Sequence, residues 1–103
     1  MGNDELRKLR EQLRGYTLQI LDLAQLRTDA SVCIAEIKDK YGLPTCDPEQ
    51  EKRIIDGARG YAESIGLDPD FTEKLVTLLM DYSKRIQDEF RKSIPESAST
   101  KND

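Results

Sequence analysis

A single arginine interrupts the apolar stripe of the longest periodic segment in the chain. In alternating steps of three and four residues, which mark one face of an α-helix, the stripe contains ten apolar or aromatic residues and Arg27. The other members are Leu6, Leu9, Leu13, Tyr16, Ile20, Leu23, Ala30, Ile34, Ile37 and Tyr41. An unpaired buried charge is costly. Arg27 is therefore expected to meet an anion, supplied either by the protein or by a ligand.

A second cation follows on nearly the same face of this segment. Lys38 lies eleven residues after Arg27, so a helix places the two within about 20° of each other and about 16 Å apart along the axis. Long side chains that lean toward each other across that distance could hold a small anion. The structural alternative is that Arg27 pairs with a glutamate of a partner helix, or fixes the register of a helix pair.

Arg10 belongs to the same segment but cannot serve the same pocket within one chain. It precedes Arg27 by 17 residues, which is about 25 Å along a helix and about 100° around it. In an antiparallel dimer, the first part of one helix passes the middle of the other, and Arg10 could then complete the site of the partner. Without such a partner, Arg10 is an ordinary solvated surface charge.

Further polar side chains lie on the inner edges of two later segments. Ser83 and Gln87 are one helical turn apart beside an apolar stripe, where polar groups need hydrogen-bond partners. They could line a ligand site or simply be satisfied inside a helix bundle. Glu51 falls in the first turn of another helix, after an Asp47 N-cap, where an acid also favours the helix dipole.

Composition limits the chemistry that these residues can perform. The chain contains no histidine, so the commonest zinc ligand and the usual general base near neutral pH are missing. We expect neither a metal nor a cofactor. A net charge of −4 argues against nucleic acid as a partner. No apolar run approaches the roughly 20 residues of a membrane span, and the charged N-terminus is not a secretory signal. A cytoplasmic protein without membrane contacts is expected.

Three helices account for the elements that must position these side chains, and no strand pattern is present. The first runs from about Asp4 to Tyr41 and ends at "YGLP". The second begins after Asp47 and ends before Gly66; the third begins at Pro69. Glycines 57 and 60 weaken the second helix, so close packing is expected there. The last ten residues, 94–103, are polar and small, which is typical of a disordered tail.

The length of the first helix predicts a dimer. A helix of 38 residues is about 57 Å long, whereas a globule of 100 residues has a radius of gyration of about 13 Å. One chain cannot cover such a rod, so its apolar stripe is expected to pack against a second copy. The predicted fold is all-α, with three helices per chain and an intertwined antiparallel homodimer.

The motifs taken together resemble the all-helical class of chorismate mutases over roughly residues 4–91. The resemblance lies in "LR" at residues 9–10 and 26–27, "IAEIK", "YGLP", "DPEQE", "GLDPDF" and "DYSKRIQ". It implies one catalytic domain over residues 1–93. The positions that match the family's site are Arg10, Arg27, Lys38, Asp47, Glu51, Ser83 and Gln87. One departure is Gln50, where the family usually has an arginine just before the glutamate of the second helix. One secondary cation near the carboxylate network is therefore missing, and weaker substrate binding is expected rather than loss of activity.

The resemblance implies the Claisen rearrangement of chorismate to prephenate, a step toward phenylalanine and tyrosine. This pericyclic reaction needs no proton transfer, so a protein without histidine can catalyse it. By resemblance, Arg27 and the partner's Arg10 hold the two substrate carboxylates, with Ser83 supporting one. Lys38 and Gln87 flank the ether oxygen, where negative charge develops.

By the same resemblance, the ring hydroxyl of the substrate is bound by Glu51 and by the backbone near Asp47. Two alternatives remain open at the level of sequence. The chain could be an isochorismate–pyruvate lyase, which shares the fold and much of the pocket. It could also be a non-catalytic helical dimerisation module, in which Arg27 pairs with an acid.

Overall fold

A computed structural model describes residues 1–94 of the chain and contains three helices. Helix α1 spans Gly2–Lys40, α2 spans Pro48–Ile65 and α3 spans Pro69–Ser93. Within the described range there is no strand, so the predicted all-α fold is confirmed. None of these helices is both long enough and apolar enough to cross a bilayer. Except for Ile94, the predicted C-terminal tail lies outside the described residues.

Helices α2 and α3 begin with the same capping device. The carboxylate of Asp47 accepts a hydrogen bond from the backbone N–H of Gln50 at 3.2 Å, and that of Asp68 accepts one from Phe71 at 2.9 Å. A proline occupies the first turn in both helices, where its missing N–H costs nothing. Helix α2 ends at Gly66, whose φ of 78° lies in the left-handed region that glycine adopts most easily. These caps fix where the helices start and stop, as the sequence predicted.

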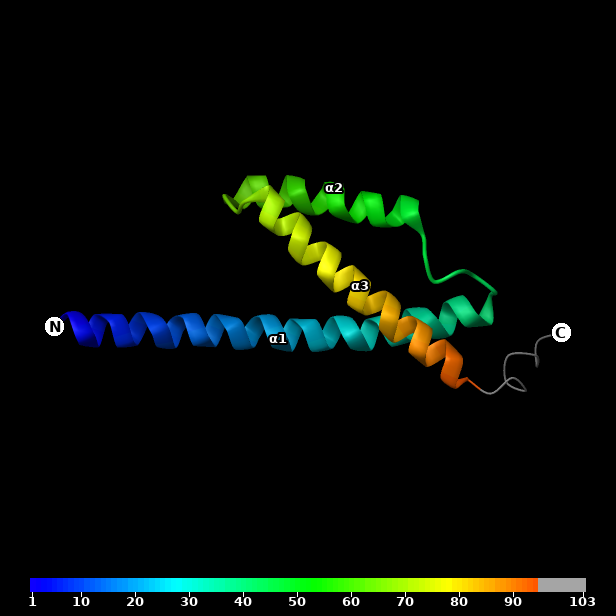
Figure 1. Cartoon of the computed structure of the whole chain (residues 1–103), viewed down its shortest axis with the longest axis horizontal. Coiled ribbons are helices and arrows are strands. Elements are labelled where there is room, and N and C mark those ends of the chain that lie inside the picture. The colour runs from blue at the N-terminus through cyan, green and yellow to red at the C-terminus, as the bar shows by residue number, and fades with distance from the viewer. Residues whose placement is uncertain (95–103) are drawn as a thin grey trace.

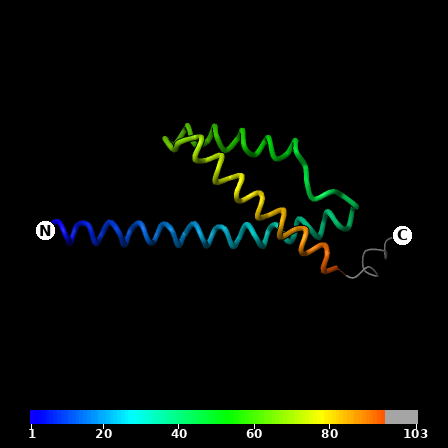
Figure 2. The backbone as a smooth tube through the Cα atoms, viewed as in Figure 1, coloured from blue at the N-terminus to red at the C-terminus, as the bar shows by residue number. Residues whose placement is uncertain are grey.

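The three helices form an elongated molecule in which α3 is the central element. Helix α3 packs against both α1 and α2, and it crosses α1 in the C-terminal half of that helix (Figure 1). The N-terminal end of α1 extends past the other two helices (Figure 2). The 39 residues of α1 make a rod of about 58 Å. The radius of gyration is 18.7 Å, compared with about 13 Å for a compact domain of this size.

The apolar stripe of α1 is largely uncovered in the single chain. Leu9, Leu13 and Leu23 are each at least 61% exposed, and Tyr16 is 59% exposed. Within residues 1–94, the buried apolar residues are confined to Ala35, Ala62 and Met80. Apolar patches of this extent on a monomer usually mark an interaction surface.

The face of α1 that contacts α3 is offset by one residue from the stripe identified in the sequence. Ser31 and Ala35 are buried, and Thr28 and Lys38 are half-buried, whereas Ile34 and Ile37 remain exposed. One residue corresponds to a rotation of about 100° around a helix. Small side chains at positions 31 and 35 allow α3 to approach α1 closely. The larger apolar side chains of the stripe stay free as a result.

The expectation of close packing at two glycines of α2 is wrong for the single chain. A Cβ atom built on either Gly57 or Gly60 would meet no neighbouring atom within 4 Å. Helix α2 contacts α3 through another face, on which Ala62 is 1% exposed. The helix thus bears the conformational cost of both glycines without a packing contact in one chain.

Candidate active site

A cavity of about 370 Å³ lies among the three helices and the loop that joins α1 to α2. Its volume falls within the range of small-molecule sites. Six of the seven site residues predicted from the sequence line it. They are Arg27 and Lys38 from α1, Asp47 from the loop, Glu51 from α2, and Ser83 and Gln87 from α3. Residues far apart in the chain therefore meet because α3 crosses α1 at this point.

Arg27 faces the cavity and contacts only neutral groups in the described chain. Its Nη1 atom donates to Ser83 Oγ at 3.3 Å and to the Leu79 carbonyl at 3.4 Å. Ser31 Oγ lies 3.0 Å from Ser83 Oγ, and so positions that hydroxyl. No carboxylate of residues 1–94 comes within 4.0 Å of the Arg27 guanidinium. The alternative in which Arg27 pairs with an acid is therefore not realised among residues 1–94 of one chain.

Lys38 connects the loop to α3 through neutral acceptors. Its Nζ atom donates to the Thr45 carbonyl at 2.8 Å and to Gln87 Oε1 at 3.0 Å. Gln87 is only 6% exposed. Because its amide oxygen accepts from Lys38, its amide NH2 group is the part left to donate. An ammonium and an amide donor thus stand side by side on the cavity wall, which suits an oxygen that gains negative charge.

Glu51 has an ion-pair partner that sequence reasoning missed. Lys84 Nζ lies 2.7 Å from Glu51 Oε1 and 3.5 Å from Asp81 Oδ1. The hydrogen bond from Lys84 lowers the pKa of Glu51, although partial burial opposes the change. Lys84 could have been found from its spacing, because it lies three residues before Gln87 and thus on a neighbouring part of the same helix face.

The Glu51–Lys84 pair predicts a pH-dependent contribution to stability. The pKa of Glu51 is lowered from its usual 4.5, so the stabilisation is present above pH 4.5 and is lost as pH falls through the lowered value. We expect Lys84→Met to lower the melting temperature at pH 7. The loss in the free energy of unfolding should be at most about 1 kcal/mol, because both side chains are partly solvated. Melting curves recorded by circular dichroism should show that the difference in melting temperature between the variant and wild type disappears below pH 4.5. A gap that persists at lower pH would contradict this ionic origin.

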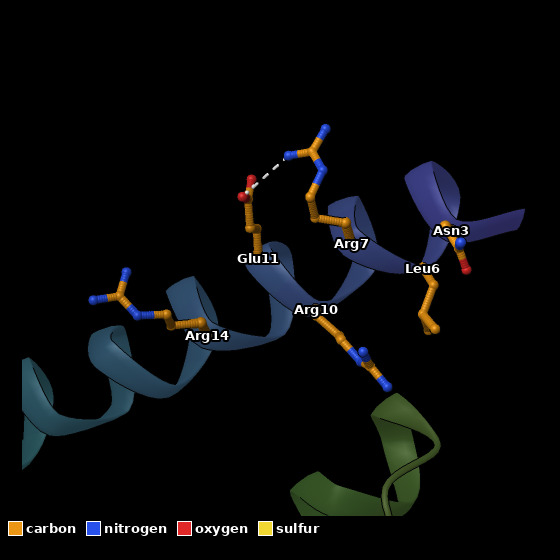
Figure 3. A pocket seen from close by; sticks show the side chains of 6 residues that line it. All are labelled: Asn3, Leu6, Arg7, Arg10, Glu11 and Arg14. Atoms are coloured by element: carbon orange, nitrogen blue, oxygen red, sulfur yellow. Dashed lines mark hydrogen bonds and ion pairs between the residues drawn. The ribbon is translucent and has the colours of Figure 1, made fainter. Parts of the chain in front are cut away.

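Arg10 is not near the other six residues in a single chain. It lies in the exposed N-terminal part of α1, where it lines a separate surface hollow. Figure 3 shows its side chain on the same side of the helix as Leu6, away from Arg7 and Glu11, which bond each other at 3.2 Å. A site that included Arg10 would therefore need the N-terminal half of α1 from another chain.

The fold and the cavity together define a class of protein. It is an all-helical protein whose small-molecule cavity is lined by three cations, two carboxylates and neutral hydrogen-bond donors, without histidine. Of the cations, Lys84 is paired with Glu51, whereas Arg27 and Lys38 contact neutral groups. Residues 9–88 match the family described as chorismate mutase type II. The chain belongs to this family, whose reaction is an isomerisation.

Curated relatives agree with the family match. The chorismate mutase of Methanocaldococcus jannaschii is 29% identical over 87 residues, which cover 84% of this chain and 88% of that protein. The 4-amino-4-deoxychorismate mutase of Streptomyces venezuelae is 32% identical over 85 residues, 82% of each chain. The T-protein of Enterobacter agglomerans is 32% identical over 94 residues. That match covers 89% of this chain but only a quarter (25%) of the length of the T-protein.

Proposed function

We propose that this protein is a chorismate mutase that converts chorismate to prephenate in the synthesis of phenylalanine and tyrosine, with residues 1–93 as its catalytic domain. The observation that carries the proposal is the pair of cations in one cavity. Arg27 and Lys38 both face it, and no carboxylate of the described chain lies within 4.0 Å of either. A dianionic substrate would supply the missing negative charge.

The rearrangement is unimolecular, so the protein must fold the substrate into a compact chair and stabilise charge as a C–O bond breaks. Arg27 binds one carboxylate with support from the Ser83 hydroxyl. Lys38 and Gln87 donate to the ether oxygen, where electrostatic preorganisation is most effective. Glu51 and the backbone near Asp47 receive the ring hydroxyl. No acid, base or nucleophile is needed in this scheme.

The second substrate carboxylate requires Arg10 of the partner subunit. The exposed apolar stripe of α1 supports an antiparallel homodimer, because the rod would bury this stripe against a second copy. In that arrangement the N-terminal half of one α1 lies beside the cavity of the other chain. Arg10, which is remote from the cavity of its own chain, then completes the cavity of its partner. Arginine suits this role because it binds a carboxylate through two parallel hydrogen bonds.

The test of the proposed function is the consumption of chorismate, followed by ultraviolet absorbance, with the product identified by chromatography. Formation of prephenate is the expected result. Pyruvate released from isochorismate, with chorismate untouched, would instead identify the lyase alternative. If neither substrate reacts and neither raises the melting temperature, the helical dimerisation module becomes the better description.

The rate is expected to be nearly independent of pH between about pH 6 and 8. The chain has no histidine, the residue type that normally titrates in this range. Gln87 is neutral, and the lowered pKa of Glu51 keeps that carboxylate ionised throughout. Initial rates at saturating chorismate across this window provide the measurement. A change of tenfold or so would show that another titrating group takes part.

A further inference from the structure

Each oxygen of the Glu51 carboxylate contacts one group of its own chain. Lys84 contacts Oε1 at 2.7 Å, and the Cys46 thiol donates to Oε2 at 3.5 Å. The side chains of Glu51 and Lys84 are only 25% and 33% exposed, and both residues line the cavity. The negative charge that Glu51 would present to a ligand is therefore balanced by an ammonium at contact distance.

The position of Lys84 accounts for the departure at Gln50. The resemblance to chorismate mutases implies an arginine immediately before the glutamate of α2, and this chain has the neutral Gln50 there. Gln50 and Lys84 both line the cavity, but they come from different helices. A cation beside Glu51 is thus present after all, supplied by α3 instead of α2.

We propose that Lys84 is a positioning residue that sets substrate specificity at this end of the cavity, favouring a neutral ring hydroxyl over an ammonium. Glu51 still accepts a hydrogen bond from a hydroxyl while it is paired with Lys84. A substrate ammonium would meet the like charge of Lys84 at the same place, which is strongly unfavourable. The inference rests on the proposed function and deepens it, because it predicts selection of chorismate over its 4-amino analogue.

The charges near this subsite come from every element that surrounds the cavity. They belong to Lys38 of α1, Asp47 of the loop, Glu51 of α2, and Asp81 and Lys84 of α3, with Cys46 as a further titratable group. Of these, only Lys84 places a cation in contact with Glu51. Removing the charge of Lys84 should therefore make a substrate with an ammonium group more acceptable, while the Glu51 carboxylate remains as the hydrogen-bond acceptor.

The experiment compares kcat/KM for chorismate and for 4-amino-4-deoxychorismate at pH 7 in wild type and variants. Lys84→Met and Lys84→Gln remove the charge, Lys84→Arg keeps it, and Arg85→Met removes a neighbouring cation that does not line the cavity. We expect the preference of wild type for chorismate to shrink about tenfold or more in both neutral variants. Lys84→Arg and Arg85→Met should retain the wild-type ratio. An unchanged ratio in a folded, active neutral variant would overturn the proposal.

A measurement on wild type alone keeps the proposal testable if the neutral variants fail to fold. As pH rises through the pKa of the analogue's amine, the ligand loses its charge, while the raised pKa of Lys84 keeps the lysine cationic. The ratio of kcat/KM for chorismate to kcat/KM for the 4-amino analogue should then fall. A ratio that stays constant as pH rises would contradict the proposed role of Lys84. If wild type converts neither substrate, the proposed function itself fails. If wild type converts chorismate but the ratio never moves, only the role of Lys84 fails.

Discussion

Replacing Lys38 with alanine should lower kcat by about 10²–10³-fold or more, the cost typical of losing one preorganised donor at a developing negative charge. Lys38 donates to Gln87 Oε1 at 3.0 Å, so its removal also frees the Gln87 amide to rotate away from the substrate. The two donors proposed to flank the ether oxygen would thus be impaired by one substitution. Steady-state kinetics with chorismate provide the measurement.

The control for this variant must separate catalysis from folding. Lys38 also donates to the Thr45 carbonyl at 2.8 Å, which helps hold the loop between α1 and α2. Its loss should cost about 1–3 kcal/mol of stability, so circular dichroism and a melting curve must show that the variant is folded at the assay temperature. Lys40→Ala, which changes an exposed lysine outside the cavity, should retain wild-type kcat. A folded Lys38→Ala protein with a near-normal rate would exclude Lys38 from the mechanism.

Mixing two inactive variants should restore activity if Arg10 acts across a dimer interface. Arg10→Ala alone is expected to lower kcat/KM by about 10²-fold, because a substrate carboxylate loses its charged partner. In a hybrid dimer of Arg10→Ala and Lys38→Ala chains, one of the two sites contains both native residues. With random exchange, half of the dimers are hybrids, so about a quarter of wild-type activity should return. Activity is measured after exchange has been verified by native mass spectrometry.

A matched mixture shows whether the recovered activity comes from a shared site. Arg10→Ala chains mixed with the Arg10→Ala/Lys38→Ala double variant also form hybrids, but no site in them is intact. This mixture should stay inactive, and Arg7→Ala, which alters an exposed neighbouring arginine, should behave as wild type. If verified Arg10→Ala and Lys38→Ala hybrids show no gain, Arg10 does not complete the site of a partner chain.

Local signals in the sequence were sufficient to predict the helices. The Asp–Pro starts at residues 47–48 and 68–69 and the glycine that ends α2 act through neighbouring backbone groups, so their effect does not depend on the rest of the fold. The stripe through Arg27 likewise gave the period of α1. The stripe does not show which face meets α3, because contact within the chain depends on the small side chains of Ser31 and Ala35.

The candidate site was predicted only in part, and the reason is again distance in the chain. The resemblance placed six residues that the structure brings to one cavity, but spacing along a helix could not show which groups would pair across it. Lys84 was overlooked: its spacing from Gln87 indicates the shared part of the helix surface, but nothing within its own helix indicates the contact with Glu51. The pair exists because α3 packs against α2 with these two side chains facing each other.

The sequence by itself determined the three helices, their caps, the absence of histidine and the unusual cation at position 27. These are properties of residue type and of spacing within one or two helical turns. Only the tertiary structure decided that Arg27 has no acid partner among residues 1–94, that Lys38 contacts Gln87, and that Lys84 pairs with Glu51. Each of these depends on the crossing of α3 over its neighbours, which brings together side chains separated by 33 to 56 residues.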